Sequence, residues 1–201
     1  DFDHLVGVLD VIKVFQTKRI IVPVQMVQHL TKPFQHVLQQ ATMRVVQIQT
    51  QNAGWSCQVG DISISILSPK YHAPHTSSNA SSLVLLFRAH GRSVLFTGDI
   101  DEERIQALID NQIDADIVEL PHHGEWSLEA QQFIDHTTPV AVLQSTNITR
   151  HAKDNWVIPN KTERFVTAID GTITTTITKE GNISVSGSNN PDTMPPCVST
   201  N

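Results

Sequence analysis

The sequence predicts an α+β domain built from stacked layers of helices and strands. Short β-branched runs bounded by Gly, Asn, Asp or Pro occur along the chain together with segments of helical periodicity. The two kinds of segment do not alternate strictly, which favours stacked layers over a doubly wound parallel sheet. The 201 residues are enough for one domain with a well-buried core.

The first half of the chain predicts two helices and four strands. Apolar residues recur at helical spacing over Leu5–Phe15, and Asp1 and Asp3 directly before it are carboxylates that suit a helix N-terminus. A second helix is expected over Pro33–Met43, because Pro is well tolerated at the first position of a helix. The expected strands are short alternating or β-branched runs: Arg19–Val24, Val45–Thr50, Trp55–Val59 and Ile62–Leu67.

The second half begins with the strongest strand signal. Two apolar runs, Ser82–Ala89 and Arg92–Thr97, flank His90 and Gly91 and therefore predict a hairpin. The later elements are expected in this order: helix 101–111, strand 117–120, helix 127–136, strand 140–143 and a Thr-rich hairpin over 172–186. After Gly187 the chain turns to Ser, Asn, Pro and Thr without periodicity. We therefore expect a domain over residues 1–187 and a disordered polar tail over 188–201.

Composition argues against a polyanion-binding surface and a disulfide scaffold. The formal net charge is -6, so any nucleic-acid contact must be local or assisted by metal ions. Two cysteines, Cys57 and Cys197, do not make a disulfide framework. No apolar run reaches the length of a membrane span. The 10 histidines are a high number beside 20 acidic residues, and histidine is the commonest metal ligand.

Three sites place metal-ligating side chains beside a strand end or a helix start. They are the opening Asp1-x-Asp3-His4, the single Asp99 after a strand and a Gly, and the pair His122-His123 after a strand and a Pro. Carboxylate oxygen and imidazole nitrogen are zinc donors at about 2.0–2.2 Å, and strand-end loops can bring several such groups to one point. Each site also has a structural interpretation: helix caps, a turn residue and a solvated histidine pair.

The same three sites carry a resemblance to a known family. The stretch DFDHLVGV looks like the Asp-x-Asp-His end of the His-x-Asp-x-Asp-His motif of metallo-β-lactamase-fold hydrolases. The segments NASSLVLLFRAHGRSVLFTGDI and DADIVELPHHG are similar to two blocks of ComEC-type DNA-internalisation proteins, and VTAIDGTITTTITKEGNISV resembles their last strands. Nearly the whole chain thus resembles the metallo-β-lactamase-fold domain of ComEC-type proteins.

This resemblance implies a four-layer αββα sandwich with a metal site at the edge between its two sheets. It implies two metal ions, zinc or manganese. The ligands that it implies by position are Asp1, Asp3, His4, Asp99 and one or both of His122 and His123. Asp99 and Asp3 would be the catalytic carboxylates, and Asn79 and Ser82 match family residues near the cleft. The sequence does not choose between the two adjacent histidines.

The chain departs from the family pattern at three places. The first histidine of the motif falls before Asp1, as do the strands that normally precede it, so we expect a fold that is incomplete at the amino end. Val6-Gly7 stands where the family has Gly-Gly. The late Gly-His-Pro of the family is missing, and His151 in NITRHAKDN is the nearest candidate for the cleft. A missing ligand would weaken metal affinity and leave the other donors less well organised.

The resulting hypothesis is a metal-dependent hydrolase domain that cleaves phosphodiester bonds of DNA during uptake. The resemblance implies two partners, DNA and the membrane channel portion of the same polypeptide. It also implies a soluble domain of a bacterial cytoplasmic-membrane protein. Two alternatives stay open: a catalytically degenerate domain with a binding or structural role, and a metallo-hydrolase of another small ester. Trp126 would line the pocket, stack on a base or pack in the core.

Overall fold

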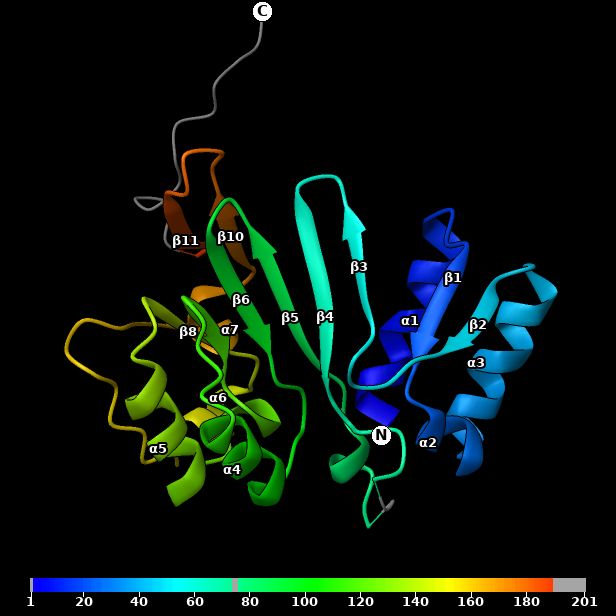
Figure 1. The fold of residues 1–201 in the computed structure, drawn as a ribbon, viewed down its shortest axis with the longest axis horizontal. Coiled ribbons are helices and arrows are strands. Elements are labelled where there is room, and N and C mark those ends of the chain that lie inside the picture. Colours follow the sequence, from blue (N-terminus) through cyan, green and yellow to red (C-terminus); the bar gives the residue numbers. More distant parts are fainter. Residues whose placement is uncertain (1, 74–75, 190–201) are drawn as a thin grey trace, which may run out of the picture.

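A seven-stranded sheet forms the centre of the fold (Figure 1). The computed structural model describes residues 2–73 and 76–189, without the side chains of Phe2, Asp3 and Val6. The strands lie side by side in chain order: β3 (Ser56–Val59), β4 (Ile62–Ser68), β5 (Val84–Ala89), β6 (Arg92–Phe96), β7 (Ile117–Glu119), β8 (Ala141–Gln144) and β9 (Glu163–Val166). Each strand of this sheet therefore pairs with the next strand along the chain.

The sheet is antiparallel in its first part and parallel in its second. The pairs from β3 to β6 are antiparallel, whereas β6, β7, β8 and β9 run parallel to one another. Parallel strands end at the same edge, so the carboxyl ends of β6, β7 and β8 lie together. The amino end of β5 lies at this edge too, because Leu85 pairs with Phe96. The segments that follow β6, β7 and β8 and precede β5 therefore meet at one edge.

Two helices, α4 (Glu102–Asp110) and α5 (Leu128–Thr137), cover one face of the sheet (Figure 1). Each begins at a side-chain cap: the oxygens of Asp101 and Ser127 accept hydrogen bonds from backbone N–H groups of the first turn. Their apolar sides pack against β5, β6, β7 and β8 in the largest buried cluster, in which Phe133 is fully buried. These helices and the sheet make the first two layers.

The hairpin of β10 (Ile173–Ile177) and β11 (Ile183–Gly187) covers the opposite face. β10 reads Ile-Thr-Thr-Thr-Ile, and its half-buried residues alternate with the exposed Thr174 and Thr176, which gives the hairpin one packed side and one exposed side. The packed side lies on sheet residues that point away from α4 and α5: Phe87, Val94, Ile117, Ala141, Leu143 and Phe165. The sheet is thus buried on both faces over β6, β7 and β8.

The amino-terminal part forms a smaller unit of two helices on two strands. Helices α1 (Phe2–Val14) and α3 (Lys32–Met43) pack against the parallel pair of β1 (Arg19–Val22) and β2 (Gln47–Thr50), with α2 (Val24–Gln28) in the connection. Its core residues are Leu5, Ile12, Val22, Phe34, Val37, Ala41 and Val46. The predicted α+β class with stacked helices and sheets is confirmed.

Most predicted elements are present with shifted ends. The first helix begins at Phe2 rather than Leu5, so His4 lies inside its first turn and not before it. Four elements were not predicted: α2, β9, α6 (Ile148–His151) and α7 (Thr167–Asp170). Each spans only four or five residues, which is too short for apolar periodicity to be visible in the sequence.

The described structure continues past Gly187. The backbone N–H of Ser188 donates to the carbonyl of Thr172 at 2.9 Å, and the side-chain amide of Asn189 donates to the carbonyl of Ile169 at 2.9 Å. The remainder of the expected tail, residues 190–201, lies outside the described residues. None of the helices within residues 2–73 and 76–189 combines the length and hydropathy needed to cross a membrane.

Candidate metal centre

Two loops at one edge of the sheet carry the candidate ligands. Asp99 follows β6, and the short turn η2 (His122–Gly124) follows β7. Because β6 and β7 are parallel neighbours, these loops leave the sheet side by side. The backbone N–H of His122 donates to the carbonyl of Gly98 at 2.9 Å. This hydrogen bond fixes η2 relative to the loop that carries Asp99.

The turn before Asp99 is shaped by main-chain contacts. Gly98 has a φ of 57°, in the left-handed region that favours glycine, and an added Cβ would lie 3.3 Å from the carbonyl oxygen of Leu83. The Gly98 N–H donates to the carboxylate of Glu119 at 3.3 Å, and the Thr97 hydroxyl donates to the Glu119 carbonyl at 2.9 Å. The Asp99 side chain is consequently held in one place and is only 9% exposed.

Glu119 is a second buried carboxyl group behind this turn. Burial raises the pKa of Glu119, and the charge of Asp99 raises it further, against the lowering effect of hydrogen bonds from Gly98 and Thr97. A raised pKa disfavours a second negative charge directly behind Asp99. The arrangement therefore leaves Asp99 as the carboxylate that faces the site.

The turn η2 holds both of its histidines in the left-handed region, with φ of 51° for His122 and 59° for His123. This conformation costs a residue with a Cβ roughly 1–2 kcal/mol, so surrounding contacts must hold it. One such contact joins His123 Nδ1 to the carbonyl oxygen of Ser145 at 3.0 Å. A carbonyl can only accept a hydrogen bond, so Nδ1 carries the proton and Nε2 presents its lone pair.

Helix α1 supplies the third side chain. His4 Nε2 lies 2.8 Å from Asp99 Oδ2, and His123 Nε2 lies 3.6 Å from the same oxygen. The centroids of the two imidazole rings are 5.1 Å apart. One donor atom from each of the three residues lies within 4.8 Å of the others. We call His4, Asp99 and His123 the metal group.

The donor set of the metal group fits a divalent ion. Two imidazole nitrogens and one carboxylate oxygen are zinc ligands, and catalytic zinc sites commonly use three protein ligands and leave a further position for water or substrate. The hydrogen bond from His123 Nδ1 to a backbone carbonyl is the arrangement that orients a ligating imidazole. The side chain of His4 is 41% exposed, against 26% for His123 and 9% for Asp99, and His123 Nε2 is itself buried, so the group is most exposed at His4.

A buried network holds η2 from beneath. Gln144, at the end of β8, is fully buried, and its side-chain amide donates to the carbonyl of His123 at 3.3 Å. Its Oε1 accepts from Arg164, which also donates to Asp154. Burial acts to raise the pKa of Asp154, but the hydrogen bond and charge of Arg164 outweigh it, and the pKa is lowered. Gly124 has a φ of 79° and packs so closely that an added Cβ would overlap the Gln144 side chain.

The geometry separates the two adjacent histidines. His123 points to Asp99, whereas His122 Nδ1 lies 3.2 Å from Glu125 Oε2 and outside the metal group. The sequence left this choice open. The structure favours His123 as the ligand, because the left-handed turn aims the two rings in different directions.

The other predicted ligands lie elsewhere or beyond the description. Asp1 lies outside the described residues, and Asp3 lies in α1 without a described side chain. His151 is in α6, where its Nδ1 lies 3.2 Å from Asp154 Oδ2. It therefore belongs to the network beneath η2 and not to the metal group.

Two pockets flank the metal group. The Asn79 pocket has a volume of about 340 Å³ and contains His4 and Asp99 in its wall. Asn79 and Ser82, both expected near the cleft, line the same pocket, since they lie in and just after the turn η1 (Asn79–Ser81) that precedes β5. The rest of its wall comes from α2 and the segments beside it, from the neighbours of Asn79 and Ser82, and from Gly98.

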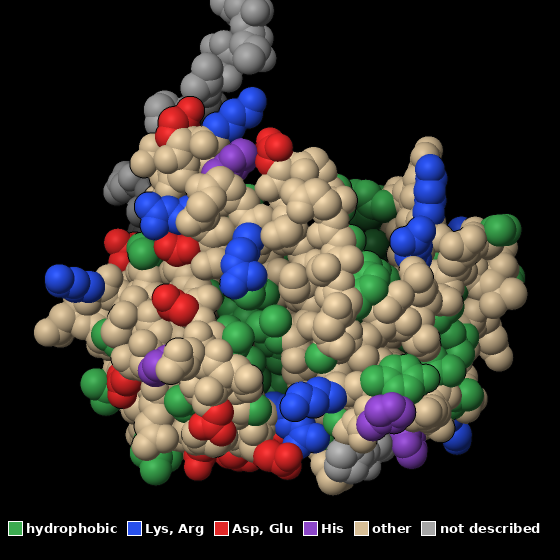
Figure 2. Space-filling model, in the orientation of Figure 1, with side chains coloured by type: hydrophobic (Ala, Val, Ile, Leu, Met, Phe, Trp, Pro, Cys, Tyr) green, Lys and Arg blue, Asp and Glu red, His purple; other side chains and the backbone are tan. Residues whose placement is uncertain are grey.

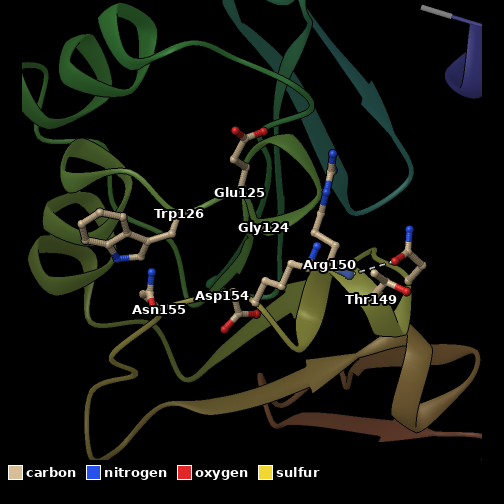
Figure 3. A pocket seen from close by; sticks show the side chains of 9 residues that line it. Gly124, Glu125, Trp126, Thr149, Arg150, Asp154 and Asn155 are labelled. Carbon is tan, nitrogen blue, oxygen red and sulfur yellow. Dashed lines mark hydrogen bonds between the residues drawn. The ribbon is translucent and has the colours of Figure 1, made fainter.

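The Trp126 pocket is lined by the end of η2 and by residues that follow β7 and β8, and it has a volume of about 570 Å³ (Figure 3). Its wall includes Gly124, which directly follows His123 of the metal group, together with Trp126, Arg150 and Lys153. In Figure 3 the indole and the Arg150 side chain lie on opposite sides of Gly124. The Asn79 pocket therefore contains two residues of the metal group, whereas the Trp126 pocket meets it only through Gly124, the residue after His123.

Residues 1–122 match the family model of the beta-lactamase superfamily domain, which is more than half of the chain. The chain belongs to this superfamily. ComE operon protein 3 of Bacillus subtilis (strain 168) is 31% identical to this superfamily domain over 147 residues, 72% of the chain and 19% of that protein. The resemblance to ComEC-type proteins is confirmed by this match, and the domain spans about a fifth of that relative's length.

Solved structures with related folds are more distant from this superfamily domain. The metallo-beta-lactamase fold protein YhfI from Bacillus subtilis is 12% identical, with a TM-score of 0.40 over 71% of this chain and 58% of that chain. CmlA, a diiron beta-hydroxylase from Streptomyces venezuelae, is 15% identical, with a TM-score of 0.38 over 62% of this chain and 30% of that chain. Both TM-scores lie below 0.5, so the family assignment rests on the sequence matches.

The sequence did not reveal the network that supports the ligand turn of this superfamily domain. Gln144 comes from β8, Asp154 from the segment after α6 and Arg164 from β9, all beyond the part matched by the family model. The short sequence NITRHAKDN places His151 and Asp154 three positions apart, which indicates a possible local contact on one turn. No spacing signals that Arg164 would reach the same carboxylate from a strand.

Proposed function

We propose that this beta-lactamase superfamily domain is a metal-dependent phosphodiesterase that acts on DNA during its uptake. The convergence of His4, Asp99 and His123 at one sheet edge carries the proposal. Hydrolysis of an ester by a metal requires metal-ligand side chains beside a space that a substrate can enter, and His4 and Asp99 line such a pocket. The choice of DNA rests on the ComEC-type resemblance.

Each residue of the site would have a role that follows from its position. When bound, a divalent ion supplies Lewis acidity and lowers the pKa of water at the site. His4, Asp99 and His123 would hold it, and the carbonyl of Ser145 would keep the His123 ring in its ligating tautomer. A second ion, with Asp3 as a further catalytic carboxylate, stays part of the proposal.

Polar side chains of the Asn79 pocket would bind the substrate next to the ion. Asn79 carries an amide and Ser82 a hydroxyl, and both can donate to phosphate oxygens without adding charge. Neutral donors of this kind position a phosphate, while the ion and the cations of the other pocket balance its charge.

The charge of the domain makes general attraction to DNA weak. Its net charge is -6, and acidic and basic side chains are interspersed on the face shown in Figure 2, without a continuous basic band there. Affinity for a polyanion would therefore come from local contacts around the metal group rather than from a broad field. We expect DNA to bind weakly when no metal is present.

The proposed context is a larger bacterial membrane protein. The ComE operon protein 3 match covers 19% of that protein, so a similar polypeptide would have room for further regions. A membrane channel portion of the same polypeptide would deliver the DNA, and the domain would be a part outside the bilayer at the cytoplasmic membrane.

Metal content and nuclease activity test this proposal together. Elemental analysis should find zinc or manganese in the purified native chain. The Asp99→Ala variant should contain much less of that metal. Labelled DNA should then be cleaved by the metal-loaded chain and not by the variant. Absence of metal from both proteins would favour the alternative of a degenerate binding domain. Metal without DNA cleavage, with activity on small esters, would favour the alternative of another ester hydrolase.

A further inference from the structure

The Trp126 pocket contains an aromatic side chain that does not pack in the hydrophobic core. Trp126 is 41% exposed, and its indole N–H makes no hydrogen bond within residues 2–73 and 76–189. Trp156 also lies close to Gly124 but contrasts with Trp126: it is 9% exposed, and its indole N–H donates to the carbonyl of Gly124 at 2.8 Å. Of two indoles close to Gly124, one is therefore a core residue and the other faces the pocket.

Two cations line the same pocket. Arg150 Nη1 donates to the carbonyl of His122 at 3.3 Å, which keeps the guanidinium beside η2. Lys153 is exposed and pairs with no carboxylate in the part of the chain that the structure describes. Both cations are therefore available to an anionic ligand, and the hydrogen bond to His122 places one of them directly beside the ligand turn.

One of the two acidic side chains of the pocket is already paired with a cation. Asp154 accepts from Arg164 and lies 3.2 Å from His151. Glu125 lies 3.2 Å from the imidazole of His122. Because Arg164 offsets the charge of Asp154, Glu125 is the carboxylate that stands against Arg150 and Lys153. The pocket is positive locally, although the chain as a whole is negative.

We infer that the Trp126 pocket is a binding subsite for a nucleotide of a single-stranded nucleic acid, with Trp126 stacking on its base and Arg150 and Lys153 binding its phosphates. The inference rests on the proposed function and specifies the form of its substrate. Aromatic side chains and cations in one groove are the combination that binds single strands. A base can lie flat on an indole only when it is unpaired, so the subsite selects single strands or frayed ends.

The position of the pocket connects this subsite to the reaction. Gly124, in its wall, directly follows His123 of the metal group. Its volume of about 570 Å³ lies within the usual range for small-ligand sites. A strand whose base rests on Trp126 would therefore have a neighbouring phosphodiester beside the metal group.

Equilibrium binding without metal tests the subsite separately from catalysis. A fluorescein-labelled single-stranded oligodeoxynucleotide is titrated with the chain in EDTA, and its anisotropy gives Kd. Trp126→Ala should raise Kd about 10-fold, whereas Trp126→Phe should keep most of the affinity because it keeps a stacking face. A duplex of the same sequence whose ends are closed by interstrand cross-links, and which therefore has no unpaired bases, should bind more weakly and should not distinguish the variants. An unchanged Kd in folded Trp126→Ala would overturn the inference.

Salt dependence tests the two cations. Arg150→Gln and Lys153→Gln should each lower the slope of log Kd against log salt by about 0.7, the value for one phosphate contact of a single strand. Lys179→Gln removes the same charge at the exposed turn of the β10–β11 hairpin and should leave the slope unchanged. Slopes that are equal in all four proteins would overturn the assignment of phosphate contacts to this pocket.

The failures of the two proposals give different results. If metal-loaded chain cleaves DNA and Trp126→Ala binds and cleaves equally well, the subsite is wrong and the proposed function stands. If the subsite variants lose binding and no metal condition gives cleavage, the pocket binds single strands and the phosphodiesterase is wrong.

Discussion

The Asn79 pocket and the Trp126 pocket flank the same metal group but differ in chemistry. The first presents an amide and a hydroxyl from the segment before β5, and it shares His4 and Asp99 with the metal group. The second presents an indole and two cations from the segments after β7 and β8, and it adjoins His123 only through Gly124. One pocket contains two residues of the metal group, and the other borders the third.

This difference indicates a division between positioning and recognition. Neutral donors next to the ligands can hold a reacting group in place without a large contribution to affinity. Cations and an exposed aromatic ring contribute affinity for the remainder of a long anionic substrate. Of the four predictions below, the first changes the metal group. The next two change residues that line the Trp126 pocket, and the last changes a residue of the Asn79 pocket.

The largest expected effect is a loss of metal affinity when the metal group is changed. Asp99→Ala removes the carboxylate that both histidines approach, so metal affinity should fall on the order of 100-fold or more, beyond the loss typical of outer-shell changes. Isothermal titration with zinc and manganese measures this loss. Asp10→Ala removes an exposed carboxylate from α1 and serves as the control. Equal affinity in Asp99→Ala and the native chain would contradict the metal group.

The second prediction concerns stability, and it distinguishes the contact between Gly124 and Gln144 from the strain of a left-handed backbone alone. Gly124→Ala adds a Cβ that overlaps Gln144 and forces a left-handed residue, so the free energy of unfolding should fall by about 2–4 kcal/mol. Gly60→Ala has a similar φ of 58° with nothing within 4 Å of the added Cβ, and it should cost about 1 kcal/mol. Urea denaturation measures both values. Equal losses would mean that Gln144 does not constrain η2.

The third effect concerns the response of the Trp126 side to acid. The folded pKa of Asp154 is lowered, so its contribution to stability is present above the unfolded value of about 3.9 and is lost as pH falls through the folded pKa. Asp154→Asn should therefore destabilise the protein most near neutral pH. Urea unfolding between pH 6 and pH 3 should show the two proteins approaching each other as pH falls. A difference that stays constant over this range would count against the Arg164 pair as its cause.

The smallest expected effect is a change in KM when Ser82 of the Asn79 pocket is replaced. Ser82→Ala removes one neutral donor, so KM for a DNA substrate should rise about 2- to 10-fold while kcat changes less. Ser63→Ala in β4 is the matched control, because it removes a hydroxyl outside both pockets. If kcat falls and KM stays constant, Ser82 acts in the transition state rather than in positioning.

The fold class and the loop of Asp99 could be predicted from the sequence. Two apolar runs around His90-Gly91 define the β5–β6 hairpin by local rules, and an aspartate directly after a strand and a glycine stands at a sheet edge. The partnership of His4 with Asp99 was reached only through resemblance, since no local rule joins a helix start to a strand end so far along the chain. Its proximity depends on how α1 packs.

The choice of His123 could not be predicted, because it depends on the backbone of η2. Two consecutive left-handed residues are held by contacts with Ser145 and Gln144, which lie about twenty residues later in the chain. The role of His151 was hidden for the same reason, since its partners Asp154 and Arg164 meet only when α6 and β9 are in place. Tertiary contacts, and not local propensity, decide both positions.

The distance along the chain between His4 and Asp99, 95 residues, couples ion binding to the folding equilibrium. The central sheet pairs neighbours in sequence and can form from local contacts, but the metal group exists only while α1 lies against the sheet edge. An ion that binds only this docked state would stabilise it by mass action, by about 2.7 kcal/mol at 100 times its Kd. Chelation should therefore accelerate amide hydrogen exchange in α1 while leaving β5 and β6 protected, so that exchange in this helix reports how much of the domain is loaded.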